Sequence, residues 1–380
     1  MNKQRCLYVA LVMLTIAFGA ALWHSTIPAP PVNAPDRAIA ALSAQNDDAG
    51  FARALQPRDF VFPRDHASHD DFRSEWWYFT GHLRDASNRP WGFQLTLFRF
   101  ELSAHQSRSP SKWRTPRVLL GHFALTDIAG RQFHAFERLS RAMPAIAGAS
   151  VTPPAVWLDD WRIEQRGEHG WHLRAGQDGV EIDLDLAAAS AVVLQGEAGL
   201  SRKSSAAGNA SYYYSVPRLS AHGQVRLAGG EHAVDGTAWL DREWSTSALS
   251  REQSGWDWFA VQLNDGGSLM FYRLRHRDGG TDAFSAGSYV DARGVQHALR
   301  ASDVAIDVLG RWRSPKTGRD YPQGWRLRVA SAALDLTLLP RLADQEWRAR
   351  FHYWEGAVTV SQAGQPAGLG YVELTGYRPR

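Results

Sequence analysis

From Glu75 to the C-terminus the chain repeats one pattern, in which short β-rich or alternating segments are separated by turn residues. Residues 85–90 and 129–130 are typical hairpin connections. About sixteen such segments at regular spacing predict an all-β protein of antiparallel sandwiches or barrels. Residues 186–194 fit either a short helix or a strand. The expected strands are 76–85, 91–102, 117–128, 131–138, 156–166, 170–175, 180–186, 212–228, 232–241, 256–265, 268–275, 284–291, 302–312, 324–339, 347–361 and 368–377.

A weak internal repeat indicates two related halves. The aromatic pattern that begins at Trp76 recurs 180 residues later at Trp256, and a second echo pairs Gly236 with Gly368. A length of 380 residues also suggests two domains, at roughly 150 residues per domain. We therefore predict tandem β-domains over 57–248 and 249–380. Chance similarity between aromatic-rich strands is the alternative explanation.

The N-terminus has the features of an export segment. Lys3 and Arg5 precede an uncharged apolar run over 7–23. We expect residues 1–24 to be a cleaved signal peptide or an uncleaved inner-membrane anchor, followed by a linker over 25–56. With the positive end inside, the rest of the chain would be periplasmic or secreted. Cys6 is the single cysteine, so disulfides cannot stabilise the body of the protein.

Charge and motifs exclude several classes of function. Lys and Arg number 42 against 39 Asp and Glu, and the basic residues are scattered, so we expect no nucleic-acid partner. The sequence has neither a G-x-x-x-x-G-K phosphate loop nor a G-x-S-x-G nucleophile elbow. His66 and His69 form an H-x-x-H pair, but on a strand or loop this spacing has no fixed metal geometry. We expect no metal and no cofactor.

Five segments carry a resemblance to a known family. They are 62–85 (FPRDHASHDDFRSEWWYFTGHLRD), 211–218 (SYYYSVPR), 236–244 (GTAWLDREW), 254–275 and 368–377. Together they resemble the AttH-like family, which also contains the carotenoid 1,2-hydratases (hydroxyneurosporene synthases) and many predicted secreted hydrolases. The resemblance extends over nearly the whole chain after about residue 57.

The resemblance implies a fold, a partner and a chemistry. The fold would be two lipocalin-like (calycin) antiparallel β-barrels packed together. The partner would be the large permease of an ABC-type transport system, beside which AttH-like proteins act as accessory components. The chemistry of the hydratase branch is protonation of an isoprenoid double bond by a carboxylic acid, followed by addition of water. That step needs an acid whose pKa is raised by an apolar environment and aromatic faces that stabilise a cation.

Six carboxylates lie within two residues of Trp or Tyr and are candidates for such an acid. They are Glu75, Asp241, Glu243, Asp257, Glu355 and Glu373. We expect Asp241, Asp257 and Glu243 to be catalytic if the protein is an enzyme. The competing interpretation is a salt-bridge network in which Arg273 or Arg99 pairs with the acids of segment 239–244. On a strand, Glu75 shares a face with Trp77, opposite Trp76 and Tyr78.

The expected ligand-binding residues combine aromatic rings with polar groups. They are Glu75, Trp76, Tyr78, Tyr213, Tyr214, Trp239, Trp244, Trp256, Arg273, Tyr353, Glu355 and Glu373. Our leading hypothesis is a protein that binds an apolar, isoprenoid or lipid-like ligand as a periplasmic transport accessory. The alternative is a hydratase of the carotenoid 1,2-hydratase type, and the segment 239–244 lacks the histidine that this branch carries nearby. A third possibility is a structural envelope protein whose barrels are filled.

Overall fold

A computed structural model describes residues 48–379 except 105–114, 228, 229, 248 and 251. The predicted export segment, 1–24, and most of the predicted linker lie outside the described residues. Within the described part of the chain, none of the helices has the length and apolarity needed to cross a membrane. Strands dominate this part, and its helices are the short 3-10 turns η1 (Arg64–His66), η2 (Ala301–Asp303) and η3 (Ala330–Ala332).

The N-terminal half forms a 13-stranded antiparallel sheet in the order β4-β3-β2-β1-β13-β12-β9-β8-β7-β6-β5, with β10 and β11 paired to β12. Its strands are β1 (Ser74–Asp85), β2 (Pro90–Glu101), β3 (Arg117–Asp127), β4 (Gln132–Arg141), β5 (Ala147–Val151), β6 (Pro154–Leu158), β7 (Trp161–Arg166), β8 (Gly170–Gln177), β9 (Val180–Ala188), β10 (Val193–Leu194), β11 (Leu200–Arg202), β12 (Ala210–Leu227) and β13 (Gly230–Ser245).

The C-terminal half forms a 10-stranded antiparallel sheet in the order β17-β16-β15-β14-β25-β24-β22-β21-β18, with β23 paired to β24. Its strands are β14 (Gln253–Leu263), β15 (Ser268–His276), β16 (Ala286–Val290), β17 (Gln296–Arg300), β18 (Ala305–Val308), β21 (Trp325–Val329), β22 (Leu334–Pro340), β23 (Glu346–Arg348), β24 (His352–Gln362) and β25 (Gln365–Leu374). A separate hairpin pairs β19 (Arg311–Arg313) with β20 (Asp320–Pro322).

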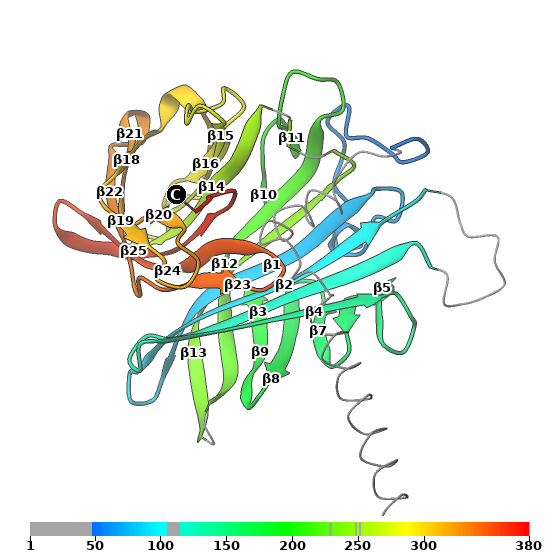
Figure 1. Ribbon diagram of the computed structural model, residues 1–380, viewed down its shortest axis with the longest axis horizontal. Helices are drawn as coiled ribbons and strands as arrows, with labels where there is room; N and C mark the ends of the chain where they lie inside the picture. The colour runs from blue at the N-terminus through cyan, green and yellow to red at the C-terminus, as the bar shows by residue number, and fades with distance from the viewer. Residues whose placement is uncertain (1–47, 105–114, 228–229, 248, 251, 380) are drawn as a thin grey trace, which may run out of the picture.

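Both sheets curl into barrel-like bodies. In the first, β4 contacts β6 across the sheet ends, so the sheet nearly closes on itself. Figure 1 shows the second as a ring of strands beside the first. The predicted all-β, lipocalin-like architecture is therefore confirmed. The strands are more numerous than expected for two reasons. Two strands occupy each of the segments 156–166, 302–312, 324–339 and 347–361, and the short strands β5, β10, β11, β17 and β20 lie outside the expected segments. The segment 186–194 holds the end of β9, a break and β10, without a helix.

Side-chain alternation gives each central strand two different faces. One face packs into its own barrel, where the two largest apolar cores lie. The opposite faces of the two sheets pack against each other and form two further apolar clusters. The larger joins Tyr78, Tyr213 and Trp239 of the first sheet to Trp258 and Tyr371 of the second. We call this layer between the two sheets the seam.

The interior of the first barrel is occupied by the chain itself. Phe60 and Phe62 pack against Tyr214 inside the barrel, with ring centroids 6.1 and 5.1 Å from it. The indole of Trp77 donates to the carbonyl oxygen of His66, and the Tyr212 hydroxyl donates to that of Gln56, both at 2.9 Å. The segment before β1 thereby fills the barrel end and leaves the seam as the aromatic surface shared by both halves.

Candidate functional site

The seam contains carboxyl groups whose polar partners are neutral. Asp241 of β13 is 3% exposed and accepts hydrogen bonds from Ser215 at 2.5 Å, from the Trp239 indole at 2.7 Å and from the Tyr213 hydroxyl. Among the described residues it has no ion-pair partner. Burial raises the pKa of Asp241 to about 6, against the lowering effect of these three donors.

Glu355 and Glu373 form an opposed pair in the second half of the seam. They lie directly across from each other in the register of β24 and β25, so their side chains share one face. Tyr78 of the first sheet donates to Glu355 at 2.6 Å, and the Trp256 indole donates to Glu373 at 3.0 Å. No cation of the described chain forms an ion pair with either of them.

The protonation of this pair follows from its surroundings. Burial and the nearby charge of Glu373 raise the pKa of Glu355 well above its usual range. Burial also raises the pKa of Glu373, to about 7. Two carboxyl groups that face each other without a cation cannot easily both be ionised, so at neutral pH the pair retains a proton on Glu355. Glu355 can then donate a proton, and Glu373, whose pKa is close to neutral pH, can accept one.

Glu243 differs from the other seam carboxylates because it has a cation. Lys203 lies 3.1 Å from it, and Ser211 donates to the same carboxylate. The Lys203 ammonium also lies 4.0 Å from the ring centroid of Tyr272, whose hydroxyl hydrogen-bonds Ser201 at 2.7 Å. Glu243 is therefore ion-paired within the seam, unlike Asp241, Glu355 and Glu373.

The register explains the internal repeat seen in the sequence. Tyr78 lies opposite Asp241 in the first sheet, and Trp258 lies opposite Glu373 in the second. Each aromatic residue reaches across the seam, because Tyr78 donates to Glu355 and the Trp258 indole donates to Tyr213 at 3.1 Å. The two halves thus present equivalent faces to each other.

One end of the seam reaches solvent. Trp76, Trp256 and Glu373 are each partly exposed and border the larger seam cluster, whose central residues are buried. The seam interior holds a small cavity lined by Thr80–His82, Trp239 and Tyr371, among others. Tyr353 lies farther along, in the smaller cluster with Trp347 and Phe351. We regard the partly exposed end as the mouth of the site.

The part of the chain that matches a known family contains all of the strands. A model of the AttH-like family matches residues 53–377, which include every strand described above. This chain belongs to the AttH-like family. A crystal structure of an AttH from Nitrosomonas europaea is similar to it, with 34% identity and a TM-score of 0.76 over 86% of this chain and 100% of that one.

A hydratase shares the fold of this AttH-like protein. Kievitone hydratase from Nectria haematococca has a TM-score of 0.64 at 16% identity, and the match covers 87% of this chain and 98% of that one. No curated protein sequence matches the chain closely enough to add another relative. The predicted family is therefore confirmed, and a hydratase lies among its structural neighbours.

Of the residues expected to form the site, the structure of this AttH-like protein brings ten into the seam. They are Trp76, Tyr78, Tyr213, Trp239, Asp241, Glu243, Trp256, Tyr353, Glu355 and Glu373. Three others face the interior of the first barrel, namely Glu75, Tyr214 and Trp244. The last two, Asp257 and Arg273, lie on the barrel-facing side of the second sheet and pair with each other.

The barrel-facing acids are paired with arginines. Glu75 is fully buried, lies 2.5 Å from Arg99 and 3.0 Å from Arg242, and both guanidinium groups are also buried. Burial alone would raise the pKa of Glu75, but Arg99 and Arg242 hold it well below its usual range. Asp257 likewise lies between Arg273 and Arg275. With this lowered pKa Glu75 remains ionised at neutral pH, and Asp257 is held between two cations.

Sequence reasoning missed three groups that complete the seam of this AttH-like protein. Trp258 bridges Tyr78 and Tyr213, with its ring 5.1 Å from that of Tyr78. Lys203 provides the seam cation, and Ser215 is a donor to Asp241. Trp258 corresponds to Tyr78 in the internal repeat, and this correspondence could have identified it. Nothing in the sequence singles out Lys203 or Ser215.

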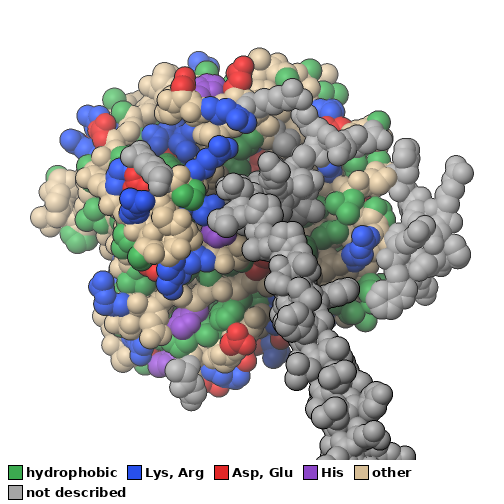
Figure 2. Space-filling model, in the orientation of Figure 1, with side chains coloured by type: hydrophobic (Ala, Val, Ile, Leu, Met, Phe, Trp, Pro, Cys, Tyr) green, Lys and Arg blue, Asp and Glu red, His purple; other side chains and the backbone are tan. Residues whose placement is uncertain are grey.

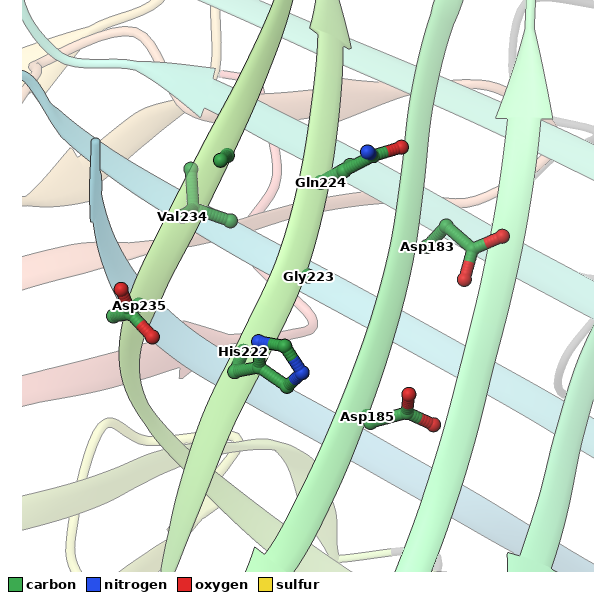
Figure 3. A pocket seen from close by; sticks show the side chains of 8 residues that line it. Asp183, Asp185, His222, Gly223, Gln224, Val234 and Asp235 are labelled. Carbon is green, nitrogen blue, oxygen red and sulfur yellow. The ribbon is translucent and has the colours of Figure 1, made fainter. Parts of the chain in front are cut away.

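An open groove lies elsewhere on the first sheet. Asp183 and Asp185 of β9, His222 of β12 and Asp235 of β13 line it, as Figure 3 shows. Its acids are solvent-exposed, and no group of three potential metal ligands occurs among the described residues. Figure 2 shows Lys and Arg side chains spread over the face in view, with Asp, Glu and apolar side chains between them. The seam therefore has the most distinctive chemistry in this AttH-like protein.

The raised pKa of Asp241 predicts a pH-dependent stability. The folded state holds this proton more tightly than the unfolded chain, so stability should fall as the pH rises from about 4 to about 6. The free energy of unfolding should fall by roughly 3 kcal/mol over this range, since each pKa unit corresponds to about 1.4 kcal/mol. In Asp241→Asn this fall should be absent. Urea unfolding of both proteins at about pH 4 and about pH 8 measures the difference. Parallel pH profiles would contradict the assignment.

Proposed function

We propose that this protein binds an apolar ligand in the seam and adds water to a carbon–carbon double bond of that ligand. The observation that carries the proposal is the opposed pair of the buried Glu355 and the partly exposed Glu373, which lies beside Tyr and Trp rings and has no cation partner among the described residues. In this pair Glu355 is the proton donor and Glu373 the base that activates water. The hydratase among the structural neighbours supports the same reaction class.

The surroundings of the pair suit the intermediate of such a reaction. Proton transfer from Glu355 to an alkene carbon breaks the carboxyl O–H bond, forms a C–H bond and leaves a carbocation on the neighbouring carbon. Aromatic faces attract positive charge, and Tyr78, Trp239 and Trp258 lie around this position. Water then bonds to the cation and gives its proton to Glu373. An isoprenoid supplies the substituted double bond that makes the cation tertiary.

Entry of the ligand requires the seam to open. Its interior is closely packed, whereas Trp76 and Trp256 at the mouth are partly exposed. We place entry there, with the ligand separating the two aromatic faces. The seam also suits the leading hypothesis from the sequence, in which the protein binds an apolar ligand without changing it. Export of the chain and a transporter permease as partner stay predictions.

An isotope experiment tests the reaction even while the substrate is unidentified. The full chain is incubated with an apolar solvent extract of bacterial cells in oxygen-18 water, and the products are compared by mass spectrometry with those of the Glu355→Gln variant. We expect a product heavier than its precursor by one labelled water and absent with the variant. Labelled products that arise by cleavage would indicate hydrolysis instead. If compounds bind but none is hydrated, the protein is a carrier.

A further inference from the structure

A chain of hydrogen-bonded groups leads from the outer strand β4 to the seam. Glu137 of β4 lies 3.3 Å from Nε2 of His122 on β3. The other ring nitrogen, Nδ1, lies 2.8 Å from the hydroxyl of Tyr353 on β24. Glu355 follows Tyr353 by two residues on the same face of β24, which places its carboxyl group beside that hydroxyl. Three strands from both sheets therefore connect a carboxylate of the outer strand to the proposed proton donor.

The two ends of this chain lie in different environments. Glu137 is partly buried and sits 3.5 Å from Arg350, whose side chain is 55% exposed. His122 and Glu355 are each only 2% exposed. The imidazole is held by stacking against Trp347 at 4.6 Å. Both ring nitrogens have partners, so the ring is fixed between the solvent side and the seam.

We propose that Glu137, His122 and Tyr353 form a proton relay that connects Glu355 to solvent. This inference rests on the proposed function, because it is Glu355 that loses a proton to the ligand there. Glu355 is 2% exposed even without a ligand, so its protons need a path through the protein. After each turnover Glu373, which is partly exposed at the mouth, releases to solvent the proton that it took from water, and the relay returns one to Glu355. His122 acts through Tyr353 and is a positioning and relay residue rather than a catalytic one.

Each step of the relay conserves atoms and charge. A proton from solvent first binds the Glu137 carboxylate. The Glu137 O–H bond then breaks as the His122 Nε2–H bond forms, and the His122 Nδ1–H bond breaks as a Tyr353 O–H bond forms. The original Tyr353 proton passes to the Glu355 carboxylate. The imidazole changes tautomer but ends neutral, and the same steps in reverse release a proton from Glu355.

The titratable and charged groups around the relay come from four strands and one turn. Glu355 faces Tyr78 of β1 and Glu373 and Tyr371 of β25. His122 faces Glu137 of β4 and Tyr353 of β24, and its other neighbours are the uncharged rings of Phe98, Trp347 and Phe351. Arg350, in the turn before β24, is the cation beside Glu137. Burial lowers the pKa of His122, which favours a neutral ring.

A pH-jump experiment on the resting protein tests the relay without any substrate. The infrared C=O band of a protonated carboxyl group reports protonation of Glu355, and it is assigned by its loss in Glu355→Gln. The full chain is shifted from about pH 9 to about pH 5, and the rise of the band is timed. The same measurement is made on Glu137→Gln, on His122→Phe and on the double variant. Glu181→Gln, a surface carboxylate paired with Arg226, is the matched control.

We expect each relay variant to slow the rise of the Glu355 band by about tenfold or more, and the control to leave it unchanged. The double variant should be no slower than either single one, because each cuts the same path. Unchanged rates in Glu137→Gln would overturn the proposal and mean that protons reach Glu355 through the mouth. Glu137 is partly exposed, so we expect Glu137→Gln to fold, and it remains informative if His122→Phe fails to fold. Since no ligand is present, the result is independent of whether hydration occurs.

Discussion

Replacing Glu75 with alanine is expected to lower the free energy of unfolding by about 3–5 kcal/mol, the largest effect on stability predicted for this protein. The variant leaves Arg242 buried without a carboxylate partner and leaves Arg99 with Glu101 alone, at 3.2 Å. The backbone carbonyl oxygens of Phe72 and Ala67 still accept from these guanidinium groups, but they do not supply a negative charge. Chemical denaturation at neutral pH measures the change.

An exposed ion pair provides the control for this prediction. Asp335 and Arg326 are joined at 2.7 Å on the surface of the second sheet, with both side chains nearly half exposed. Asp335→Ala should lower the free energy of unfolding far less than Glu75→Ala, because solvent screens such pairs. A loss of similar size in Glu75→Ala would show that the buried arginines are hydrated or rearranged in the variant.

Replacing Glu355 with glutamine is expected to reduce hydration by about 10²–10⁴-fold without unfolding the protein. Glutamine has nearly the same shape and can still accept the hydrogen bond from Tyr78, but it cannot release a proton to an alkene. The rate of oxygen-18 incorporation measures the effect, with circular dichroism to confirm the fold.

Glu346 offers the matched control within the same half of the molecule. It is 1% exposed and hydrogen-bonded by Ser314, Thr317 and Tyr321, away from the seam. Glu346→Gln should retain the hydration rate per folded molecule. Equal losses in the two variants would point to a general effect of buried carboxyl groups. Full activity in Glu355→Gln would assign the acid to Glu373 or Asp241.

Much of the architecture could be predicted because strand signals are local. Alternation and turn residues are visible within about ten residues, and they placed segments such as 91–102 and 117–128 close to β2 and β3. Some of the missed breaks between strands are tight turns that contain no glycine or proline. Asp159-Asp160 separates β6 from β7, with Asp159 in the left-handed region at a φ of 57°, and the sequence pattern runs straight through it.

The site was predictable in its residue types but not in its grouping. Asp241, Glu355 and Glu373 stand beside aromatic residues in the sequence, and this identified them as candidates. Glu75 and Asp257 look the same by that criterion. Glu75 and Asp257 differ from the seam acids because arginines pair with them, and these arginines, Arg99 and Arg273, come from neighbouring strands. Partners across a sheet, and even more across the seam, depend on register and packing that no local pattern contains.

Asp257 illustrates the same limit in a single residue. If Trp256 and Trp258 faced a core, alternation would turn Asp257 outward or toward the other half. The two Trp residues instead face the seam, so Asp257 points into its own barrel. The alternation was correct, but in a chain with cores on both faces of a strand, it does not say which core a residue enters.

The two-faced strands have a consequence for how the protein can be altered. Along β13, Trp239, Asp241 and Glu243 face the seam, while Leu240, Arg242 and Trp244 face the barrel. On a single stretch of chain, the odd positions therefore line the proposed site, and the even positions pack into the barrel interior. A combinatorial library confined to the odd positions would change the lining of the proposed site and leave the barrel core intact. A library confined to the even positions would change the barrel core, and with it thermal stability, and leave that lining intact.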